Sequence, residues 1–518
     1  MANENKYSYV SLFSSAGIDC AGLKKLSFDC ICTSELIERR LQIQKYNNVC
    51  SNPDAYVLGD IKEKSVREKI NQLIDNYLKE DIDNTIDLLI ATPPCQGISL
   101  ANHKKGNEVP RNSLVVESIS ITKAFEPEFF IFENVLRFLD TLCVMDDKPM
   151  KIKEAIFSSL GDSYRISTKV LNLKNYGSLS SRTRTLVIGT RKGSSINPLT
   201  LFPDYHKEIP LSRVIEHLPS LKEFNEFDKD DFLHHFRPYP ENMRSWISNL
   251  KEGQSAFDNT DPNNIPHQVI DGRRVENKNK NADKYKRNIY EKVAPAIHTR
   301  NDILSSQNTL HPKDDRVFSI RELMLMMTVP DDFNWFEKSS NKINELSDEE
   351  KLKLIKKQDT NIRQCLGEAI PTNVITKIVE KYIDESTAEN FCYDHLLFDL
   401  LKSIELPTIS EIWTCDEFGE STIRFAQSLE NVYKKKKIIC KSYSLDFSYV
   451  KEIYPSRTNE HVSVPDFATI IIWHNQHNHH EYIKNRSSYY LEINKELNKG
   501  KLYKNKIHLK NDQFGLFE

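Results

Sequence analysis

The chain has 518 residues, of which 39% are hydrophobic and 28% are charged, and its formal net charge is −3. This length predicts roughly three domains with sizeable cores, and the near-neutral charge excludes a protein that is basic over its whole surface. No run approaches the ~20 apolar residues of a membrane span, and the N-terminus lacks the pattern of a signal peptide. We therefore expect no membrane association and a cytoplasmic location.

The ten cysteines are scattered along the chain. They form no CxxC pair and show no metal-ligand spacing with histidine, and a chain of this size needs no disulfide to be stable. The sequence therefore predicts reduced thiols and no metal site.

Short apolar runs alternate with longer amphipathic stretches over residues 9 to 190. Six of these runs are typical of strands, namely residues 9–13, 30–35, 55–60, 87–91, 129–132 and 185–190. Such alternation predicts an α/β fold with a doubly wound, mostly parallel sheet. We assign residues 1–190 to this domain.

The first strand runs into SSAGIDCAGL, a turn of small residues that includes Gly17 and Gly22. Such a turn before a helix lets a ligand approach backbone donors. Glu35 and Asp60 end the second and third strands, where carboxylates can accept hydrogen bonds from ribose hydroxyls and an adenine amino group. Each acid alone is also explained by a helix cap or a solvated turn, but three such strand ends together favour an adenosine-containing cofactor.

A cysteine follows the fourth strand in the loop TPPCQG, where two prolines and Gly97 restrict the backbone. This rigidity suits Cys95 as a nucleophile. The fifth strand ends in Glu133, and groups just beyond the carboxyl ends of parallel strands share one crevice. We expect the thiol of Cys95 and the carboxyl of Glu133 to meet there.

Residues 191–315 lose this regularity and are rich in Pro, Asn, Asp and His, which predicts a loop-rich inserted domain. Within it, residues 271–300 carry nine Lys and Arg but four Asp and Glu. Such a run is either a solvated face or a local nucleic-acid contact. Arg273, Arg274 and Arg300 are the candidates for base or phosphate contacts.

Helical spacing returns at residues 316–327, and a second amphipathic helix is predicted after a proline within residues 367–383. We expect residues 316–384 to complete the sheet domain. Residues 385–518 mix strand and helix signals and include four consecutive lysines at 434–437. They are predicted to form an accessory domain of unknown role or an extension that binds DNA or a partner.

Taken together, the SSAGIDCAGL turn, PPCQG, the Glu133-Asn134-Val135 triplet, the arginines at 182 and 184, and GEAIPTNV resemble the DNA cytosine-5-methyltransferases of bacterial restriction–modification systems. The resemblance covers about residues 8–190 and 316–380 in the family's motif order, and residues 191–315 match its target-recognition domain by position. It implies a sequence-specific enzyme that acts on double-stranded DNA at the nucleoid. It also implies S-adenosylmethionine as methyl donor, S-adenosylhomocysteine as product and a separate cognate restriction endonuclease.

The chemistry of cytosine methylation requires the same residue types. C5 of cytosine is a poor nucleophile, so a thiolate must first add to C6, while a protonated carboxyl beside N3 accepts the developing charge. The base must also be flipped out of the duplex. Cys95 and Glu133 fit these two roles.

The resemblance also implies roles for further residues. Its catalytic set is Cys95, Glu133, Asn134, Arg182 and Arg184. Its cofactor-binding set is Phe13, Ser14, Ala16, Gly17, Ile18, Glu35, Leu36, Asp60, Ile61, Pro93, Leu114, Glu368 and Ala369. Its DNA-binding residues are Gln96, Ser99 and Arg111, to which we add Arg273, Arg274 and Arg300.

Some positions depart from the family pattern. Ser15 and Thr92 replace glycines, which costs on the order of 1 kcal/mol each if the backbone there is left-handed. Ser180 and Glu368 replace a Gln and an Asn, which weakens the expected contacts between the sheet and recognition domains. Three alternatives stay open, namely a transfer-RNA cytosine-5-methyltransferase, a nicotinamide-dependent oxidoreductase and a catalytically silent DNA-binding homologue.

Overall fold

The structure is a computed structural model. It describes residues 7–82, 84–94, 114–192, 194, 196–277 and 280–387, together with seven strands between residues 411 and 504. The chain divides into two compact units, one of residues 1–194 and 201–382 and the other of residues 195–200 and 383–518.

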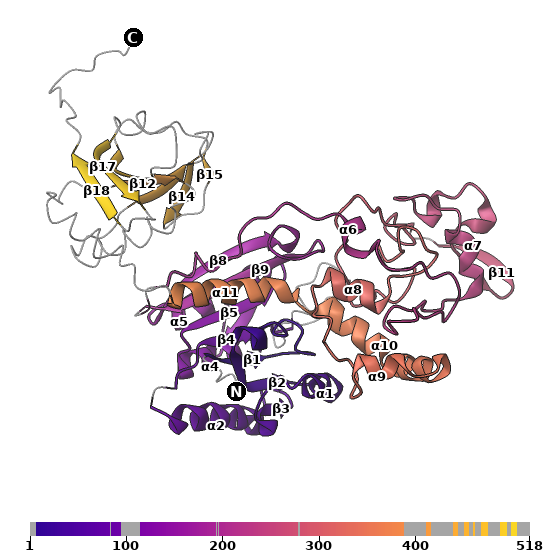
Figure 1. Ribbon diagram of the computed structural model, residues 1–518, viewed down its shortest axis with the longest axis horizontal. Coiled ribbons are helices and arrows are strands. Elements are labelled where there is room, and N and C mark those ends of the chain that lie inside the picture. The colour runs from indigo at the N-terminus through magenta and orange to yellow at the C-terminus, as the bar shows by residue number, and fades with distance from the viewer. Residues whose placement is uncertain are drawn as a thin grey trace, which may run out of the picture. The chain divides into compact units, whose positions relative to one another are not determined.

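A seven-stranded sheet forms the centre of the first unit (Figure 1). Its strands are β1 (Tyr7–Leu12), β2 (Phe28–Glu35), β3 (Tyr56–Leu58), β4 (Leu88–Ala91), β5 (Phe129–Asn134), β8 (Tyr164–Asn172) and β9 (Thr183–Arg191). Their order is β3-β2-β1-β4-β5-β9-β8, in which the first five strands are parallel and β9 and β8 are antiparallel. The predicted α/β class and its mostly parallel sheet are confirmed.

All six predicted strands are present, but β8 was not predicted. It lies at the edge of the sheet, and most of its side chains are only partly buried. Its sequence YRISTKVLN therefore lacks the continuous apolar run by which a strand buried on both faces is recognised.

Helices cover both faces of the sheet. On one face, α2 (Lys64–Glu80), α4 (Leu114–Phe125) and α5 (Ile152–Leu160) share a buried core with Phe130 and Phe132. On the other face, α11 (Thr372–Thr387) places the ring of Tyr382 4.1 Å from that of Phe129. Successive strand residues point to opposite faces, so Phe129 faces away from Phe130 and Phe132. Helix α11, which comes much later in the chain, thus covers the face of the sheet that α2, α4 and α5 do not cover.

The other helices after the sheet are α8 (Ile320–Met326), α9 (Ser340–Asn344) and α10 (Asp348–Glu368). The helices predicted within residues 316–327 and 367–383 correspond to α8 and α11. The 21-residue helix α10 was not predicted, because its surface is largely polar. Its start carries a recognisable signal, a capping box of Ser347 and Glu350 with three acidic residues in the first turn.

Residues 196–277 and 280–315 contain only short elements in the described chain. Besides three 3-10 helices of one turn each (Glu241–Met243, Ala256–Asp258 and Pro262–Asn264), these are α6 (Leu211–Ile215), α7 (Arg244–Ile247) and the hairpin of β10 (His267–Ile270) and β11 (Arg273–Glu276). One core joins Leu211 and Leu233 from this segment to Ile18 after β1 and to Leu323 and Leu366 from α8 and α10. Shared packing therefore fixes this segment against the turn that follows β1.

The first unit also contains a further helix and a small hairpin. Helix α1 (Glu38–Tyr46) follows β2, and β6 (Leu142–Met145) pairs with β7 (Lys148–Lys151) in a small hairpin. Within the described residues, no helix combines the length and apolar character needed to cross a bilayer.

The second unit contains its own seven-stranded sheet. Its strands are β12 (Glu411–Cys415), β13 (Ile439–Tyr443), β14 (Val450–Tyr454), β15 (Asn459–Glu460), β16 (Ala468–His474), β17 (Ser487–Asn494) and β18 (Lys499–Lys504). Their order is β15-β14-β13-β12-β16-β17-β18, with the four central strands parallel. The antiparallel strands lie at the two edges.

Candidate functional site

The sheet order reverses at β1, which has β2 on one side and β4 on the other. In open α/β sheets, ligands bind beyond the carboxyl ends of the strands at such a reversal. The turn after β1, the ends of β2 and β3, and the loop after β4 all lie at this edge. The candidate site is therefore built from the strand ends that the sequence singled out.

The turn after β1 is tightly wound. Phe13 and Ser15 adopt positive φ angles of 58° and 48°, and Gly17 adopts 77°. Ser15 thus occupies the left-handed conformation that a glycine would adopt without strain. Thr92 is different, because its φ is not positive; it instead donates from Oγ1 to the carbonyl of Phe13 at 3.1 Å. Of the two glycine replacements, only Ser15 carries the expected strain.

Substitution of Ser15 by glycine is expected to raise the free energy of unfolding by about 0.5–1 kcal/mol, because it removes left-handed strain from a residue with a Cβ. Denaturant titration measures the effect. The matched control is Ser14→Gly, which should destabilise the fold because Ser14 Oγ is bound by Thr33 at 2.7 Å and Gln44 at 2.8 Å. Equal effects of the two substitutions would contradict the assignment of strain to Ser15.

The carboxylate of Glu35 closes the turn. Its two oxygens accept the backbone N–H groups of Ser15 at 2.8 Å and Ile37 at 2.9 Å. Burial raises the pKa of Glu35, while these amides oppose the rise. A carboxylate oxygen has two lone pairs, so each remains able to accept a ribose hydroxyl.

Two residues beside Glu35 have contrasting surroundings. Leu36 is 63% exposed, an unusual position for a large apolar side chain that suits contact with a flat ring. Asp60 accepts the backbone N–H of Lys62 at 3.0 Å, and the ammonium of Lys62 lies 3.9 Å from its other oxygen. The described contacts of Asp60 are therefore those of a solvated turn, while Ile61 beside it is buried.

A buried polar cluster supports the turn from below and was not anticipated from the sequence. The amide of Gln44, from α1, donates to Ser14 Oγ at 2.8 Å and to the carbonyl of Ser15 at 2.7 Å. Thr33 Oγ1 lies 2.8 Å from the amide oxygen of Gln44. The cluster fixes the backbone of the turn. In the sequence it is indicated only by Gln44, a polar residue on the buried side of α1.

Glu133 lies at the end of β5 and is buried. Its Oε1 is 2.7 Å from Nε of Arg184 on β9. Burial raises the pKa of Glu133, and the charges of Arg184 and Arg182 oppose this rise without cancelling it. The carboxyl therefore keeps its proton to a higher pH than an exposed glutamate would, while it remains next to a cation.

The neighbouring Asn134 connects β5 to the loop after β4. Its Nδ2 donates to the carbonyl of Pro93 at 2.9 Å, and its Oδ1 accepts the N–H of Val135 at 2.8 Å. Pro93 therefore has a fixed place beside Glu133. Cys95, Gln96, Ser99 and Arg111 lie outside the described residues, and Leu114, the first residue of α4, packs on the sheet core.

The two arginines near β9 have different contacts. Arg184 pairs with Glu133, whereas the buried guanidinium of Arg182 donates to three backbone carbonyls, those of Ile297, Gly367 and Glu368, at 2.9–3.1 Å. Arg182 thereby satisfies the carboxyl end of α10, where unpaired carbonyls favour a cation. Arg182, directly before β9, therefore connects the sheet domain to the inserted segment at Ile297 and to the end of α10.

The two departures near this junction are accommodated. Ser180 pairs in parallel with Ala294, and the N–H of Ser181 donates to Ala294 at 2.8 Å. Glu368 forms a two-point ion pair with Arg40 of α1, at 2.8 and 3.0 Å, beside the buried Ala369. Ser180 and Glu368, which differ from the family pattern, thus still connect the sheet domain to neighbouring segments of this chain.

Asp19 is the residue of this site that sequence reasoning missed. It follows the turn after β1 and is 5% exposed. Burial raises its pKa to about 7; a hydrogen bond from its own backbone N–H and the charge of Arg182 oppose the rise, and the charges of Glu133 and Glu35 add to it. Its position, directly after the buried Ile18 in a small-residue turn, was the only available signal.

Farther along the chain, Arg273 and Arg274 lie on the exposed hairpin of β10 and β11. Its turn consists of Asp271 and Gly272, both with positive φ, as expected of a two-residue hairpin loop. Exposed Val269 and Ile270 accompany the arginines. Arg300 is more than half exposed and pairs with Asp302 at 3.0 Å.

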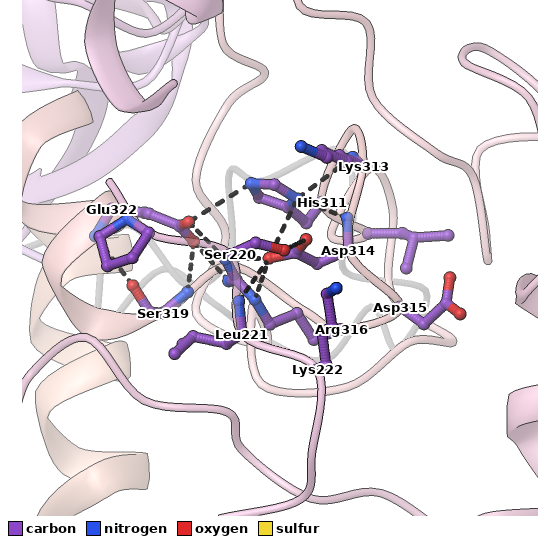
Figure 2. A network of polar contacts seen from close by, with 12 residues as sticks. Ser220, Leu221, Lys222, His311, Lys313, Asp314, Asp315, Arg316, Ser319 and Glu322 are labelled. Carbon is purple, nitrogen blue, oxygen red and sulfur yellow. Dashed lines mark hydrogen bonds and ion pairs between the residues drawn. The ribbon is translucent and has the colours of Figure 1, made fainter. Parts of the chain in front are cut away.

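A buried charge network supports the start of α8 (Figure 2). Arg316 contacts Asp314 at 2.9 Å and both oxygens of Glu322 at 2.8 Å, and His311 lies 3.4 Å from Glu322. The pKa of Glu322 is lowered because the charges of Arg316 and His311 outweigh its burial, and burial lowers the pKa of His311 to about 4. Ser319 caps the helix in the same network.

Replacement of Arg316 by methionine is expected to lower the free energy of unfolding by about 3–5 kcal/mol, because it leaves two buried carboxylates without their cation. Thermal or denaturant unfolding measures the loss. The control is Lys25→Met, which breaks an exposed pair with Asp332 and should change stability by less than about 1 kcal/mol. Similar small losses for both variants would mean that the network does not stabilise the fold.

The strand order and the crevice at the carboxyl ends of the strands define a Rossmann-like α/β protein. The family model for C-5 cytosine-specific DNA methylases matches residues 7–384. The chain belongs to that family and is a DNA cytosine-5-methyltransferase, which removes the oxidoreductase alternative.

Two curated relatives and one solved structure illustrate the similarity. The type II methyltransferase M1.HgaI of Avibacterium volantium is 30% identical over 396 residues, 73% of this chain and 98% of the relative. M1.HphI of Haemophilus parahaemolyticus is 28% identical over 337 residues, 63% of this chain and 78% of the relative. An E. coli prophage DNA modification methyltransferase is 16% identical, with a TM-score of 0.48, over 74% of this chain and 99% of that structure.

Proposed function

We propose that this enzyme methylates C5 of a cytosine flipped out of double-stranded DNA, through a transient bond between Cys95 and C6, at a specific sequence. The observation that best supports this mechanism is the buried carboxyl of Glu133, whose pKa is raised and which lies 2.7 Å from Arg184. Asn134 connects it to Pro93, two residues before Cys95. A nucleophile presented by that loop would meet a proton donor at the end of β5.

The cofactor end fits S-adenosylmethionine, which when bound supplies an electrophilic methyl group. Glu35 has lone pairs for the ribose hydroxyls, and the exposed Leu36 and the partly buried Phe13 offer apolar surface to the adenine ring. Gly17 and the strained Ser15 keep the turn close enough for backbone contacts.

The protein residues would act in a fixed order. The thiolate of Cys95 adds to C6 as protonated Glu133 donates to N3, so the ring carries no uncompensated negative charge. Once C5 has been methylated, its proton leaves to a base, the bond from sulfur to C6 breaks and N3 returns its proton to Glu133. Arg184 holds the Glu133 carboxyl in place.

DNA recognition is assigned to residues 191–315. The exposed β10–β11 hairpin carries Arg273 and Arg274, and a two-stranded ribbon fits the major groove. Arg300 has an exposed guanidinium that can reach a phosphate. Because the relatives are named type II methyltransferases, we also propose that a separate endonuclease cleaves the same sequence when it is unmethylated.

Incubation with labelled S-adenosylmethionine and either duplex DNA or transfer RNA, followed by nucleoside analysis, tests this function. Label in 5-methyldeoxycytidine is the expected result. Label only in ribonucleosides would favour the transfer-RNA alternative, and label in N4-methylcytosine would overturn C5 chemistry. A folded protein that binds DNA without transferring label would support the silent homologue.

A further inference from the structure

Asp19 is held rigidly beside the proposed cofactor site. The carbonyl of Ile18 before it accepts Oγ1 of Thr372, at the start of α11, at 2.7 Å. Gly22 after it packs so closely on α11 that an added Cβ would meet Thr376 Oγ1 at 2.3 Å. The side chain of Asp19 is 5% exposed, and its Oδ1 has no hydrogen-bond partner. The backbone on both sides thus fixes a buried carboxyl whose Oδ1 has no hydrogen-bond partner and which no cation pairs in the described chain.

The other acids at this edge already have partners in the described chain. Glu35 accepts two backbone amides, Glu133 pairs with Arg184, and Glu368 pairs with Arg40. Asp60 accepts the amide of Lys62. A buried carboxylate is unfavourable unless a cation or donors complete it, so Asp19 is the acid at this edge that a cationic ligand group would satisfy.

The position of Asp19 indicates which ligand group this is. The charges of Glu133 and Glu35 both act on its carboxyl, so Asp19 lies near the acid of the proposed reacting end and near the acid of the proposed ribose end. The amino-acid end of S-adenosylmethionine extends from the ribose and carries an α-ammonium group. We infer that the carboxylate of Asp19 accepts the α-ammonium group of the cofactor, an inference that rests on the proposed function.

Calorimetric binding of three ligands tests this assignment. S-adenosylhomocysteine carries the ammonium, its deaminated analogue lacks it, and 5′-methylthioadenosine lacks the whole amino-acid end. Asp19→Asn should weaken binding of S-adenosylhomocysteine roughly 10- to 100-fold, the value of a charge-assisted hydrogen bond. It should leave the affinities for the other two ligands unchanged.

Glu35→Gln is the matched control, because the ribose is common to all three ligands. This variant should weaken binding of all three by a similar factor, whereas Asp19→Asn should discriminate among them. Equal weakening of the three ligands by Asp19→Asn, or no weakening at all, would overturn the inference. In a parallel titration with S-adenosylmethionine, weaker binding of that ligand with unchanged binding of S-adenosylhomocysteine would also overturn the inference and would assign Asp19 to the sulfonium.

Two further measurements separate a ligand contact from a structural role. The ammonium needs the ionised form of Asp19, whose pKa is about 7 and is set by burial with Glu133, Glu35 and Arg182 nearby. The ratio of S-adenosylhomocysteine to methylthioadenosine affinity should therefore rise from pH 5.5 to 7.5 in the natural protein and stay constant in Asp19→Asn. Without ligand, the variant should melt no lower than the natural protein, since it removes a buried charge that no cation pairs in the described chain.

A melting temperature well below that of the natural protein would favour a structural role for Asp19 and overturn the inference. Failure of the natural protein to bind S-adenosylhomocysteine is a different result. It would overturn the proposed cofactor itself, whereas loss of discrimination between the ligands concerns Asp19 alone.

Discussion

Cys95→Ser is expected to lower turnover by at least about 10⁴-fold, while DNA and S-adenosylhomocysteine still bind. A free thiol is a few per cent ionised at neutral pH and is intrinsically nucleophilic, whereas a serine hydroxyl is almost never ionised. Without addition to C6, the C5 atom of cytosine does not become electron-rich enough to accept a methyl group. Single-turnover transfer of labelled methyl groups to duplex DNA measures the loss.

Cys50→Ser is the control for this prediction, because it removes a buried thiol that lies outside the strand ends of the site. It should retain turnover. A duplex that carries 5-fluorocytosine should trap a covalent adduct with the natural protein and none with Cys95→Ser, since fluorine cannot leave C5 as a cation. Appreciable turnover by Cys95→Ser, or an adduct at another residue, would eliminate the proposed covalent mechanism.

The sheet could be predicted because its central strands are buried on both faces and appear as continuous apolar runs. The strand β8 escaped prediction because an edge strand keeps polar side chains. Helix α10 escaped because its buried face mixes apolar and charged residues: Ile355, Ile362 and Leu366 lie in the core, while Asp359 pairs with Arg363 one turn on and with Arg237 of another segment. Periodicity therefore finds elements with a uniformly apolar buried face and misses those whose buried face also carries polar or charged side chains.

The candidate site was predictable to the extent that it follows strand ends. Glu35 and Glu133 lie at the ends of β2 and β5, as expected from their positions after apolar runs. The partner of Glu368 was not predictable, because Arg40 is 328 positions away in the sequence. Asp19 was missed because its significance depends on burial without a hydrogen-bond partner, which no local pattern encodes.

Arg182 and Arg184 also show that sequence spacing alone does not predict the partners of a side chain. A spacing of two residues predicts that Arg182 and Arg184 share one face of a strand. Strand β9 begins at Thr183, between them, and the guanidinium of Arg182 binds the end of α10 while Arg184 reaches Glu133. The proposed catalytic role of Arg182 would accordingly be indirect, through the position of the segments that it joins.

Glu133→Gln is expected to lower kcat about 10²- to 10⁴-fold, the usual contribution of a positioned general acid, with little change in the KM for DNA. The amide keeps the shape of the side chain but cannot give a proton to N3. Burial raises the pKa of Glu133 above its ordinary value, and the protonated form is the active one. Turnover of the natural enzyme should therefore decline as the pH rises through this raised pKa, and this decline should be absent in the variant.

Glu128→Gln is the matched control, because Glu128 lies just before β5, at the opposite end from Glu133, and pairs with Arg191 at 3.1 Å. Its kcat and pH profile should equal those of the natural enzyme. The decline at high pH distinguishes proton donation from a purely structural role, since a structural defect would lower kcat equally at every pH. If Glu133→Gln kept the natural pH profile at a reduced rate, the carboxyl would hold the base or Arg184 in place without donating a proton.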